Sequence, residues 1–431
     1  MKKYLTLPLY VAMTALLSMG MSACSDNDDD DENNSREETI KEIVNDYTAN
    51  TVIPTYEGLA NASIELYDAC LAMYNAGANN VTTAQISTAG DAWKKARQYW
   101  ERSEAWLFGP AGDYDVDPHI DSWPLDKGQL DALLADANRM NKMDAQGVYA
   151  SSLDYGLLGF HALEYMLFAL EGSGMSQISV PHSTNYTTQQ LTYIVGVAGD
   201  LRNQCIILEA AWKGESNIAQ AKRQVLNSVR QLSYKQNYEE ALNDLANGLC
   251  YADQMKNPVE GSASDFVNYL ACAQSILGQD GVQNIANEVG NVKIGNPTGQ
   301  GLSSETEYDP DYIESPYSLN SIEDFKGNII SIENAYCGLQ SSKDYNSGET
   351  LVKPVSHSFS SYVATLNPSL DNRVKAAIST AYNAIGQMKE PFAYTCNRNG
   401  EYASINQAAI NACNDLNDIF SEVLMLLQNQ R

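Results

Sequence analysis

The sequence predicts an all-α protein built from two helical-bundle domains that pack around a shared cleft. From Ile40 onward, apolar residues recur at helical spacing almost throughout the chain. The alternating, valine-rich stretches that are typical of sheets are scarce. The expected helices are long, roughly 20 residues in several cases, and short links between long helices favour antiparallel bundles.

The composition sets the size and broad class of the protein. The chain has 431 residues, of which 44% are hydrophobic, enough for two domains with large cores. A break at Lys213-Gly214 predicts an N-terminal bundle over 39–213 and a C-terminal bundle over 214–431. The formal net charge is −27, from 54 acidic and 27 basic residues. Because nucleic acid binding needs a basic surface, this charge argues against a nucleic acid partner.

Residues 1–24 have the pattern of a lipoprotein signal peptide. Lys2 and Lys3 precede an apolar stretch, and small residues stand directly before Cys24, which is expected to carry a lipid. Met21 occupies a position where this signal usually has leucine. A lipid on Cys24 would anchor the protein to a membrane without spanning it. The expected location is therefore the cell envelope, as an outer-membrane lipoprotein that faces the periplasm or the exterior.

The segment that follows Cys24 is strongly acidic. Residues 25–38 include four consecutive aspartates and cannot bury an apolar face, so a disordered tether is expected there. The seven remaining cysteines form no C-x-x-C pair, and most stand in apolar helical surroundings. They are expected to be mainly small buried hydrophobes, and one or two disulfides remain an alternative.

The helical pattern is interrupted at defined places. Pro54 predicts a kink in the first helix, and Gly109-Pro110 ends the second. A loop rich in aspartate and proline follows over 111–127, and the longest irregular region is expected at 290–316. The first predicted helix begins before Asn45 and ends near Asn75, and short helices are expected around Leu130–Met140. In chain order, the other predicted helices cover 83–108, 153–170, 188–212, 217–255, 262–289, 319–338, 357–363, 368–388 and 402–429.

The main functional clue lies in the apolar helix predicted over 153–170. His161 and Glu164 are three residues apart, so their side chains project from one face of that helix. An imidazole and a carboxylate in an apolar wall are costly unless they are paired. Two interpretations follow. The pair binds a ligand such as a metal ion, or its two side chains form hydrogen bonds within a core in which every polar group has a partner.

Further carboxylates stand near this pair in the predicted arrangement. Glu101 and Glu104 are also three residues apart, and Glu104 is expected to point inward beside Leu107 and Phe108. Asp121 comes from the acidic loop, whereas the neighbouring His119 is expected at the surface. Carboxylates with one imidazole suit a divalent or ferric ion, with iron or zinc as candidates. The predicted metal ligands are His161, Glu164, Glu104 and Asp121.

Four short motifs together resemble the imelysin family. They are the tract Trp100–Pro110, the segment Ile120–Pro124, the helix Gly159–Phe168 with its G-x-H-x-x-E element, and Ile313–Ser318. The segment from Asn287 to Pro297 also fits. The resemblance covers roughly 40–430. It implies an imelysin-like fold of two bundles with a site near the G-x-H-x-x-E motif. It also implies an envelope lipoprotein that is classed as a metallopeptidase and related to components of bacterial iron uptake. Glu101, Trp123, Glu314 and Ser318 are then expected to line the cleft and contact its ligand.

Three functions are consistent with these residues. The leading hypothesis is an envelope-anchored lipoprotein that binds a metal ion or metal-bearing ligand in the cleft, for iron acquisition together with iron-uptake proteins. The second is a metal-dependent peptidase in which Glu164 and His161 are catalytic, although a second closely spaced histidine is missing. The third is a non-catalytic module that binds peptides or glycans. The membrane is the expected partner of the lipid, and the chain is expected to be a monomer.

Overall fold

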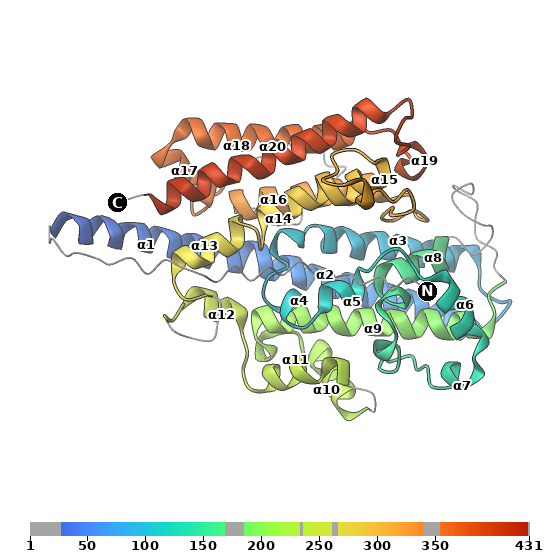
Figure 1. Ribbon diagram of the computed structural model, residues 1–431. Coiled ribbons are helices and arrows are strands. Elements are labelled where there is room, and N and C mark those ends of the chain that lie inside the picture. The colour runs from blue at the N-terminus through green and yellow to red at the C-terminus, as the bar shows by residue number, and fades with distance from the viewer. Residues whose placement is uncertain (1–26, 169–184, 233–235, 261–265, 339–353, 430–431) are drawn as a thin grey trace.

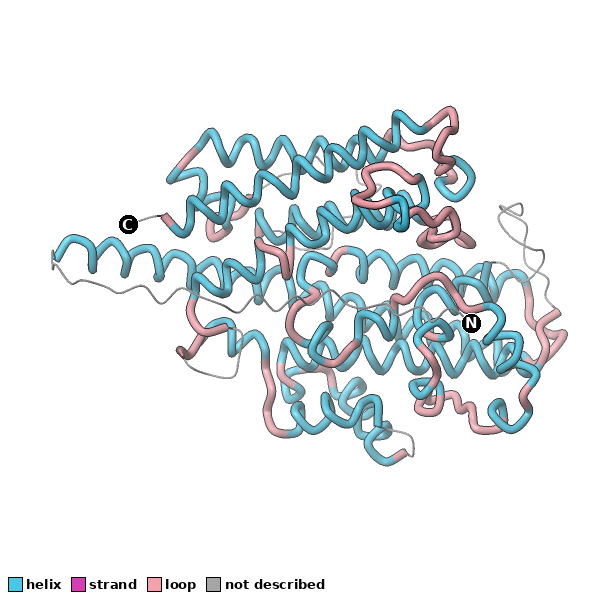
Figure 2. Tube along the Cα trace, in the orientation of Figure 1, coloured by secondary structure: helices cyan, strands magenta, loops and turns pink. Residues whose placement is uncertain are grey.

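The computed structural model describes residues 27–168, 185–232, 236–260, 266–338 and 354–429, and these ranges contain helices and loops but no strand (Figures 1 and 2). The all-α prediction is therefore confirmed. Cys24 and the signal segment lie outside the described residues, as does the end of the predicted helix 153–170. Among the described helices, none combines the length and the apolar character that crossing a membrane requires.

The first long helix is interrupted by a π-helical turn shortly before Pro54, where the sequence predicts a kink. Helix α1 (Asn27–Tyr47) continues through a π-helical turn (Thr48–Val52) into α2 (Ile53–Ala76). Pro54 stands in the first turn of α2, where its missing N–H disturbs the helix least. Because α1 begins at Asn27, most of the segment 25–38 is helical rather than the predicted disordered tether. Acidic residues at a helix N-terminus interact favourably with the helix dipole, which gives a physical reason for the difference.

The second predicted helix ends earlier than expected. Helix α3 begins after a capping box, in which Thr82 and Gln85 satisfy each other's backbone N–H groups, and spans Thr83–Glu101. A 3-10 turn (Glu104–Trp106) replaces the rest of the predicted helix 83–108. The acidic loop that follows holds two short helices, α4 (Pro110–Asp113) and α5 (Val116–Ile120), and leads to α6 (Lys127–Ala135) and α7 (Ala137–Met140).

Among the described residues, the motif helix α8 spans Gly159–Phe168. Gly159 has φ +70°, a left-handed conformation that interrupts the helix predicted over 153–170. The chain before it forms a 3-10 turn (Tyr155–Leu157). Helix α9 (Thr188–Lys213) agrees with the predicted helix 188–212 and begins with a second capping box.

The helices form two bundles that meet along α3. In the first bundle α2 packs against both α3 and α9, and α8 lies against α3 and α9. In the second bundle α18 (Pro368–Gly386) lies along α20 (Ala403–Gln428), and α16 (Ser321–Cys337) packs against α18. Contacts between α16 and α3 join the bundles, which are stacked in Figure 1 with α20 at one side and α10 at the other. The second bundle also contains α13 (Tyr269–Leu277), α14 (Val282–Asn287), α17 (Phe359–Leu366) and α19 (Phe392–Thr395).

Packing does not follow the predicted boundary between 213 and 214. The predicted helix 217–255 is three helices, α10 (Gln220–Gln231), α11 (Gln236–Ala246) and α12 (Tyr251–Lys256). All three pack on α9 and thus extend the first bundle. Gly214 has φ +82° and turns the chain back after α9, so the break in the pattern marks a reversal of the chain.

Two further expectations concern the region 290–316 and the cysteines. The region predicted to be irregular over 290–316 begins with a π-helix (Glu288–Ile294) and a single helical turn, α15 (Gly295–Thr298). All seven cysteines after Cys24 are free thiols, and six of them are buried, in agreement with a role as small hydrophobes.

Candidate functional site

The predicted site residues lie together where α3 of the first bundle meets α16 of the second. They come from α3, the 3-10 turn after it, the end of α5, α8 and the loop before α16. None of the six acidic and imidazole side chains is more than 4% exposed. These six are Glu101, Glu104, Asp121, His161, Glu164 and Glu314.

Arg97 is the first of two buried cations at the centre of this cluster. One guanidinium nitrogen, Nη2, lies 2.5 Å from Glu101 Oε1 and 2.6 Å from Glu314 Oε1. Nη1 pairs with Asp121, and Nε is 3.5 Å from Asp324 Oδ2. Burial acts against the charged guanidinium, but the surrounding carboxylates outweigh it and raise the pKa of Arg97. Arg97 thus connects carboxylates from both bundles.

Lys293 is the second buried cation. Its Nζ lies 2.9 Å from Glu104 Oε2, 3.0 Å from Glu314 Oε1 and 3.7 Å from Glu101 Oε2. The ammonium group is also 5.4 Å from the centre of the Trp123 ring. Burial opposes its charge, but the carboxylates of Glu104 and Glu314 raise the pKa of Lys293, so it stays protonated.

Sequence reasoning missed both cations. Arg97 stands four residues before Glu101, on the helix face that carries Trp93 and Trp100, so a buried ion pair was detectable there. Lys293 stands in the apolar stretch Val292-Lys293-Ile294, which is a weaker signal. Asp324 and Asn328 were also missed. They come from α16, and Asn328 Nδ2 donates a hydrogen bond of 2.6 Å to Glu101 Oε2.

His161 lies between two carboxylates. Its Nδ1 is 3.1 Å from Glu164 Oε2, in hydrogen-bond geometry. Its Nε2 is 3.1 Å from Asp121 Oδ1, but the two groups are not aligned for a hydrogen bond. Burial favours the neutral imidazole, but the carboxylates of Asp121 and Glu164 outweigh it and raise the pKa of His161 to about 9. The half-buried ring of Trp123 packs 5.8 Å from the imidazole.

Glu164 is held from both sides. Its Oε1 accepts hydrogen bonds from the backbone N–H groups of Tyr317 (2.9 Å) and Ser318 (2.7 Å), and from Ser318 Oγ (2.8 Å). Its Oε2 faces His161 Nδ1. The sequence predicts Glu164 as a ligand, but these contacts suit a carboxylate that orients the imidazole. The Glu314–Ser318 loop therefore acts on the motif helix through Ser318.

The cluster contains more carboxylates than cations. Six carboxylates, those of Glu101, Glu104, Asp121, Glu164, Glu314 and Asp324, face the three basic groups of Arg97, Lys293 and His161. Burial raises the pKa of Glu101 and Glu104, and it raises the pKa of Asp324 to about 7. Burial also acts on Asp121, but Arg97 outweighs it and lowers the pKa of that carboxyl. The network therefore retains protons at neutral pH, or it accepts a further cation.

Two sets of three side chains have the spacing to hold a metal ion. They are Asp121, His161 and Glu314 in one set and Glu101, Glu104 and Asp121 in the other, each with ligand atoms within 4.8 Å of one another. In the first set, His161 Nε2 and Glu314 Oε2 are buried and accept or donate no hydrogen bond. Arg97 and Lys293 contact carboxylates of both sets. The first set differs in that it includes an imidazole, a common ligand of first-row metal ions.

His119 is buried, contrary to the expectation of a surface residue. Its Nε2 lies 2.8 Å from Asp200 Oδ2, and Asp200 Oδ1 accepts a hydrogen bond of 2.5 Å from the hydroxyl of Tyr238. This contact connects α5 with α9. His119 is thus part of a separate polar network that supports the segment leading to Asp121.

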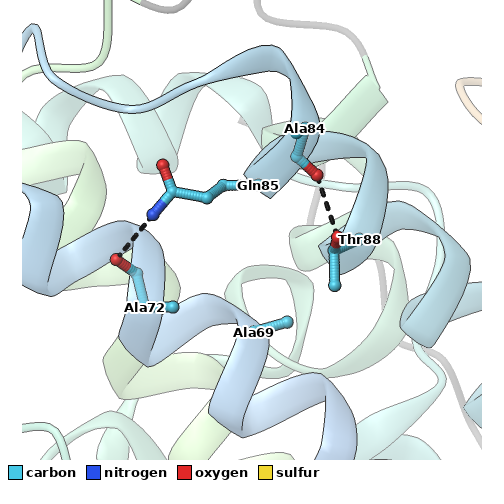
Figure 3. A pocket seen from close by; sticks show the side chains of 5 residues that line it. All are labelled: Ala69, Ala72, Ala84, Gln85 and Thr88. Carbon is cyan, nitrogen blue, oxygen red and sulfur yellow. Dashed lines mark hydrogen bonds between the residues drawn. The ribbon is translucent and has the colours of Figure 1, made fainter.

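A small groove on the surface is distant from the cluster. It measures about 160 Å³, lies between the end of α2 and the start of α3, and is lined largely by alanines (Figure 3). Gln85 reaches across it and donates a hydrogen bond of 3.2 Å to the Ala72 carbonyl. From Gln85 to Arg97 the axis of α3 extends roughly 18 Å. The groove therefore gives no access to the buried site.

Comparisons with known proteins identify the family of this chain. The family model described as Imelysin matches residues 52–421. A curated relative, iron-regulated protein A of Synechococcus elongatus, is 26% identical over 300 residues, which cover 70% of this chain and 65% of that protein's length. The crystal structure of an iron-regulated protein A precursor from Parabacteroides distasonis is 26% identical, with a TM-score of 0.69 over 91% of this chain and 95% of that one. An imelysin-like protein from Psychrobacter arcticum is 15% identical, with a TM-score of 0.53 over 91% and 94%, and shares the fold.

Proposed function

Because the chain belongs to the imelysin family, we propose that it binds a metal ion through His161, Asp121 and Glu314. The proposal has one main support. Two buried ligand atoms, His161 Nε2 and Glu314 Oε2, lack hydrogen-bond partners, and an oxygen of Asp121 lies within metal-binding reach of both side chains. Buried polar atoms are usually hydrogen-bonded, so these two atoms are suited to a ligand that the described residues do not supply.

The remaining residues have supporting roles in this proposal. Glu164 accepts the Nδ1 proton of His161, which leaves Nε2 free to bind the ion, and Ser318 fixes Glu164. Trp123 covers the imidazole. Glu104, a predicted ligand, instead pairs with Lys293. When bound, the ion supplies positive charge and Lewis acidity to the carboxylate cluster.

Iron is the ion that we place first. One imidazole and two carboxylates suit ferrous, ferric and zinc ions, so the ligands alone do not select among them. Two relatives carry the name iron-regulated protein A, which favours an iron-related role. We extend the proposal to an envelope lipoprotein, anchored through Cys24, that hands iron or an iron-bearing ligand to iron-uptake proteins.

Burial favours binding over peptide hydrolysis. His161, Asp121 and Glu314 are at most 4% exposed, so a peptide bond cannot approach these side chains without a rearrangement of both bundles. The alternative of a metal-dependent peptidase needs such an opening, with Glu164 released from Ser318 to act as a base.

Metal content is the direct test. The purified protein would be equilibrated with ferrous, ferric or zinc ions and assayed by elemental analysis and calorimetry, beside His161→Ala and Asp121→Asn. We expect about one ion per chain in the wild type and none in either folded variant. His357→Ala is the matched control, because His357 is half-exposed and pairs with Asp46 on the surface. Absence of binding in the wild type would refute the proposal, and peptide cleavage by the loaded protein would favour the peptidase alternative.

A further inference from the structure

The buried cluster is covered less completely on one side. Toward α3 and α16 its neighbours are fully buried, among them Trp100, which donates to Asp121, and Asn328. On another side Trp123 and Tyr312 are only half-buried, and their ring centres lie 5.2 Å apart. Trp123 also packs 5.8 Å from the His161 imidazole, which carries the unpaired Nε2 atom. The two aromatic rings therefore lie between this imidazole and the partly exposed surface.

Asp117 stands beside this aromatic cover, on the α5 side. Its carbonyl accepts a hydrogen bond of 3.0 Å from the backbone N–H of Asp121, four residues later. Residues four apart share a helix face, so the Asp117 side chain lies one turn away from that of Asp121. The Asp117 carboxylate is half-buried, and no side chain of the described residues forms an ion pair or hydrogen bond with it.

Glu288 stands on the other side of the cover, at the start of the π-helix Glu288–Ile294. Backbone hydrogen bonds of a π-helix join residues five apart, so Glu288 lies one turn before Lys293 on the same face. Its carboxylate is half-buried and, like that of Asp117, has no ion pair or hydrogen bond within the described part of the chain. Burial, together with the carboxylates of Asp121 and Glu288, raises the pKa of Asp117 to about 7, so the two unpaired carboxylates act on each other.

These two carboxylates, which we call the acidic rim, oppose the charge of the buried cations. An ion that approaches the cluster is repelled by Arg97 and Lys293, both of which are buried and keep their positive charge. Negative charge at the entrance offsets this repulsion, and it attracts a cation most strongly where burial limits screening by salt. Asp117 and Glu288 are suited to this task because no cation among the described residues pairs with them.

We infer that a metal cation enters the cluster past Trp123 and Tyr312, and that Asp117 and Glu288 guide it there without becoming its ligands. This inference rests on the proposed function, because it concerns the route to His161, Asp121 and Glu314. The acidic rim sets the rate at which the ion arrives. The aromatic pair sets how easily the ion passes in either direction.

Association rates test the acidic rim. Stopped-flow mixing of the full chain with Zn²⁺ and a fluorescent zinc indicator, at pH 8 where Asp117 is ionised, measures how fast the ion enters. Excess chelator then measures how fast it leaves. Steering by charge accelerates association by about 10- to 1000-fold, so we expect Asp117→Asn/Glu288→Gln to bind Zn²⁺ about 10-fold more slowly at low ionic strength. Each single variant should account for part of this loss, and added salt should reduce the difference from the wild type.

Glu240→Gln is the matched control for the single variants. It removes one exposed carboxylate from α11, a helix that packs on α9 in the first bundle, and should leave the association rate as in the wild type. Tyr312→Ala tests the aromatic cover. It should raise both the association and the dissociation rate, whereas Tyr312→Phe, which retains the ring, should change neither.

The outcomes separate the route from the site. Association that is equally fast in the wild type and in Asp117→Asn/Glu288→Gln would overturn the role of the acidic rim while the proposed function stands. Faster dissociation with unchanged association in that variant would show that the rim carboxylates hold the ion, which also contradicts the inference. Unchanged rates in Tyr312→Ala would exclude entry past the aromatic pair. No Zn²⁺ bound by the wild type at equilibrium would refute the proposed function itself.

Discussion

Gly159 packs directly against the carbonyl group of Ile120, so that a Cβ at position 159 would lie 1.9 Å from that oxygen. Gly159 also has φ +70°. The contact fixes the start of α8 against the residue that precedes Asp121. The glycine of the G-x-H-x-x-E motif therefore sets the spacing between His161 and Asp121.

Gly159→Ala tests this spacing. The added Cβ meets backbone atoms that cannot move without displacing Asp121, and the left-handed backbone adds strain. We expect a loss of roughly 3 kcal/mol or more in the free energy of unfolding, with loss of metal binding. Chemical denaturation and elemental analysis measure the two effects. In the exposed control Gly128→Ala the nearest contact is 3.5 Å, so little change is expected. Equal losses of stability and metal binding in Gly159→Ala and Gly128→Ala would contradict the role of Gly159 in this spacing.

Glu164→Gln tests the orienting role of Glu164. The amide oxygen can take the place of Oε1 toward Ser318, and the amide NH₂ then faces His161 Nδ1. An NH₂ group there donates to Nδ1 and shifts the imidazole proton to Nε2, the atom proposed to bind the metal. We expect metal affinity to fall about 10- to 100-fold. Calorimetric titration checks this, and unchanged affinity would argue that Glu164 does not select the tautomer.

The raised pKa of His161 predicts opposite pH trends for stability and metal binding. The carboxylates raise its pKa from 6.5 to about 9 in the folded protein. Its stabilising charge is therefore fully present below pH 6.5 and is lost as pH rises through 9. We expect the metal-free protein to lose about 3 kcal/mol at most over this window. Metal affinity should rise over the same window, because the ion needs the neutral imidazole.

Denaturation and calorimetry between pH 6 and 9.5 measure the two trends. His161→Gln should flatten the stability profile over this window. His357→Gln, at the half-exposed surface, should leave the profile as in the wild type. If the stability of the wild type rose with pH over this window, the raised pKa of His161 would be contradicted.

Arg97→Met is expected to lower the free energy of unfolding more than most single substitutions in the chain. It removes the fully buried charge that four carboxylates face, those of Glu101, Asp121, Glu314 and Asp324. Breaking a buried ion pair on one side costs about 3–5 kcal/mol. The nearby Lys95→Ala breaks a pair with Glu65 in which both side chains are about half exposed, and should cost less than about 1 kcal/mol. Equilibrium denaturation compares the two variants.

Cys24→Ala tests the proposed anchor. Without a lipid at this position the protein should move from the membrane fraction to the soluble envelope fraction, because one or more buried acyl chains provide the attachment. Cell fractionation with metabolic labelling by a fatty acid checks both the location and the modification. Retention in the membrane fraction with no label in the wild type would refute a lipid anchor.

The sequence determined the helices and the buried polar residues. Apolar residues at helical spacing predicted α9, α16, α18 and α20 within a few residues, because this periodicity is a local property of the chain. The same local signal pointed to His161 and Glu164, since polar side chains in an apolar helix must find partners. Helix ends were predicted less well, because a contact such as that of Gly159 with Ile120 joins segments distant in sequence.

The tertiary structure alone decided the partners. Arg97 and Lys293 lie far apart in the chain, and only the packing of α3 on α16 and of the π-helix on α20 brings both cations to Glu314. A side chain's burial can be inferred from its own helix, but the charge that it meets depends on how separate helices pack. For this reason the sequence predicted a cluster of carboxylates suited to metal ions, and the fold decided which of them already hold a cation.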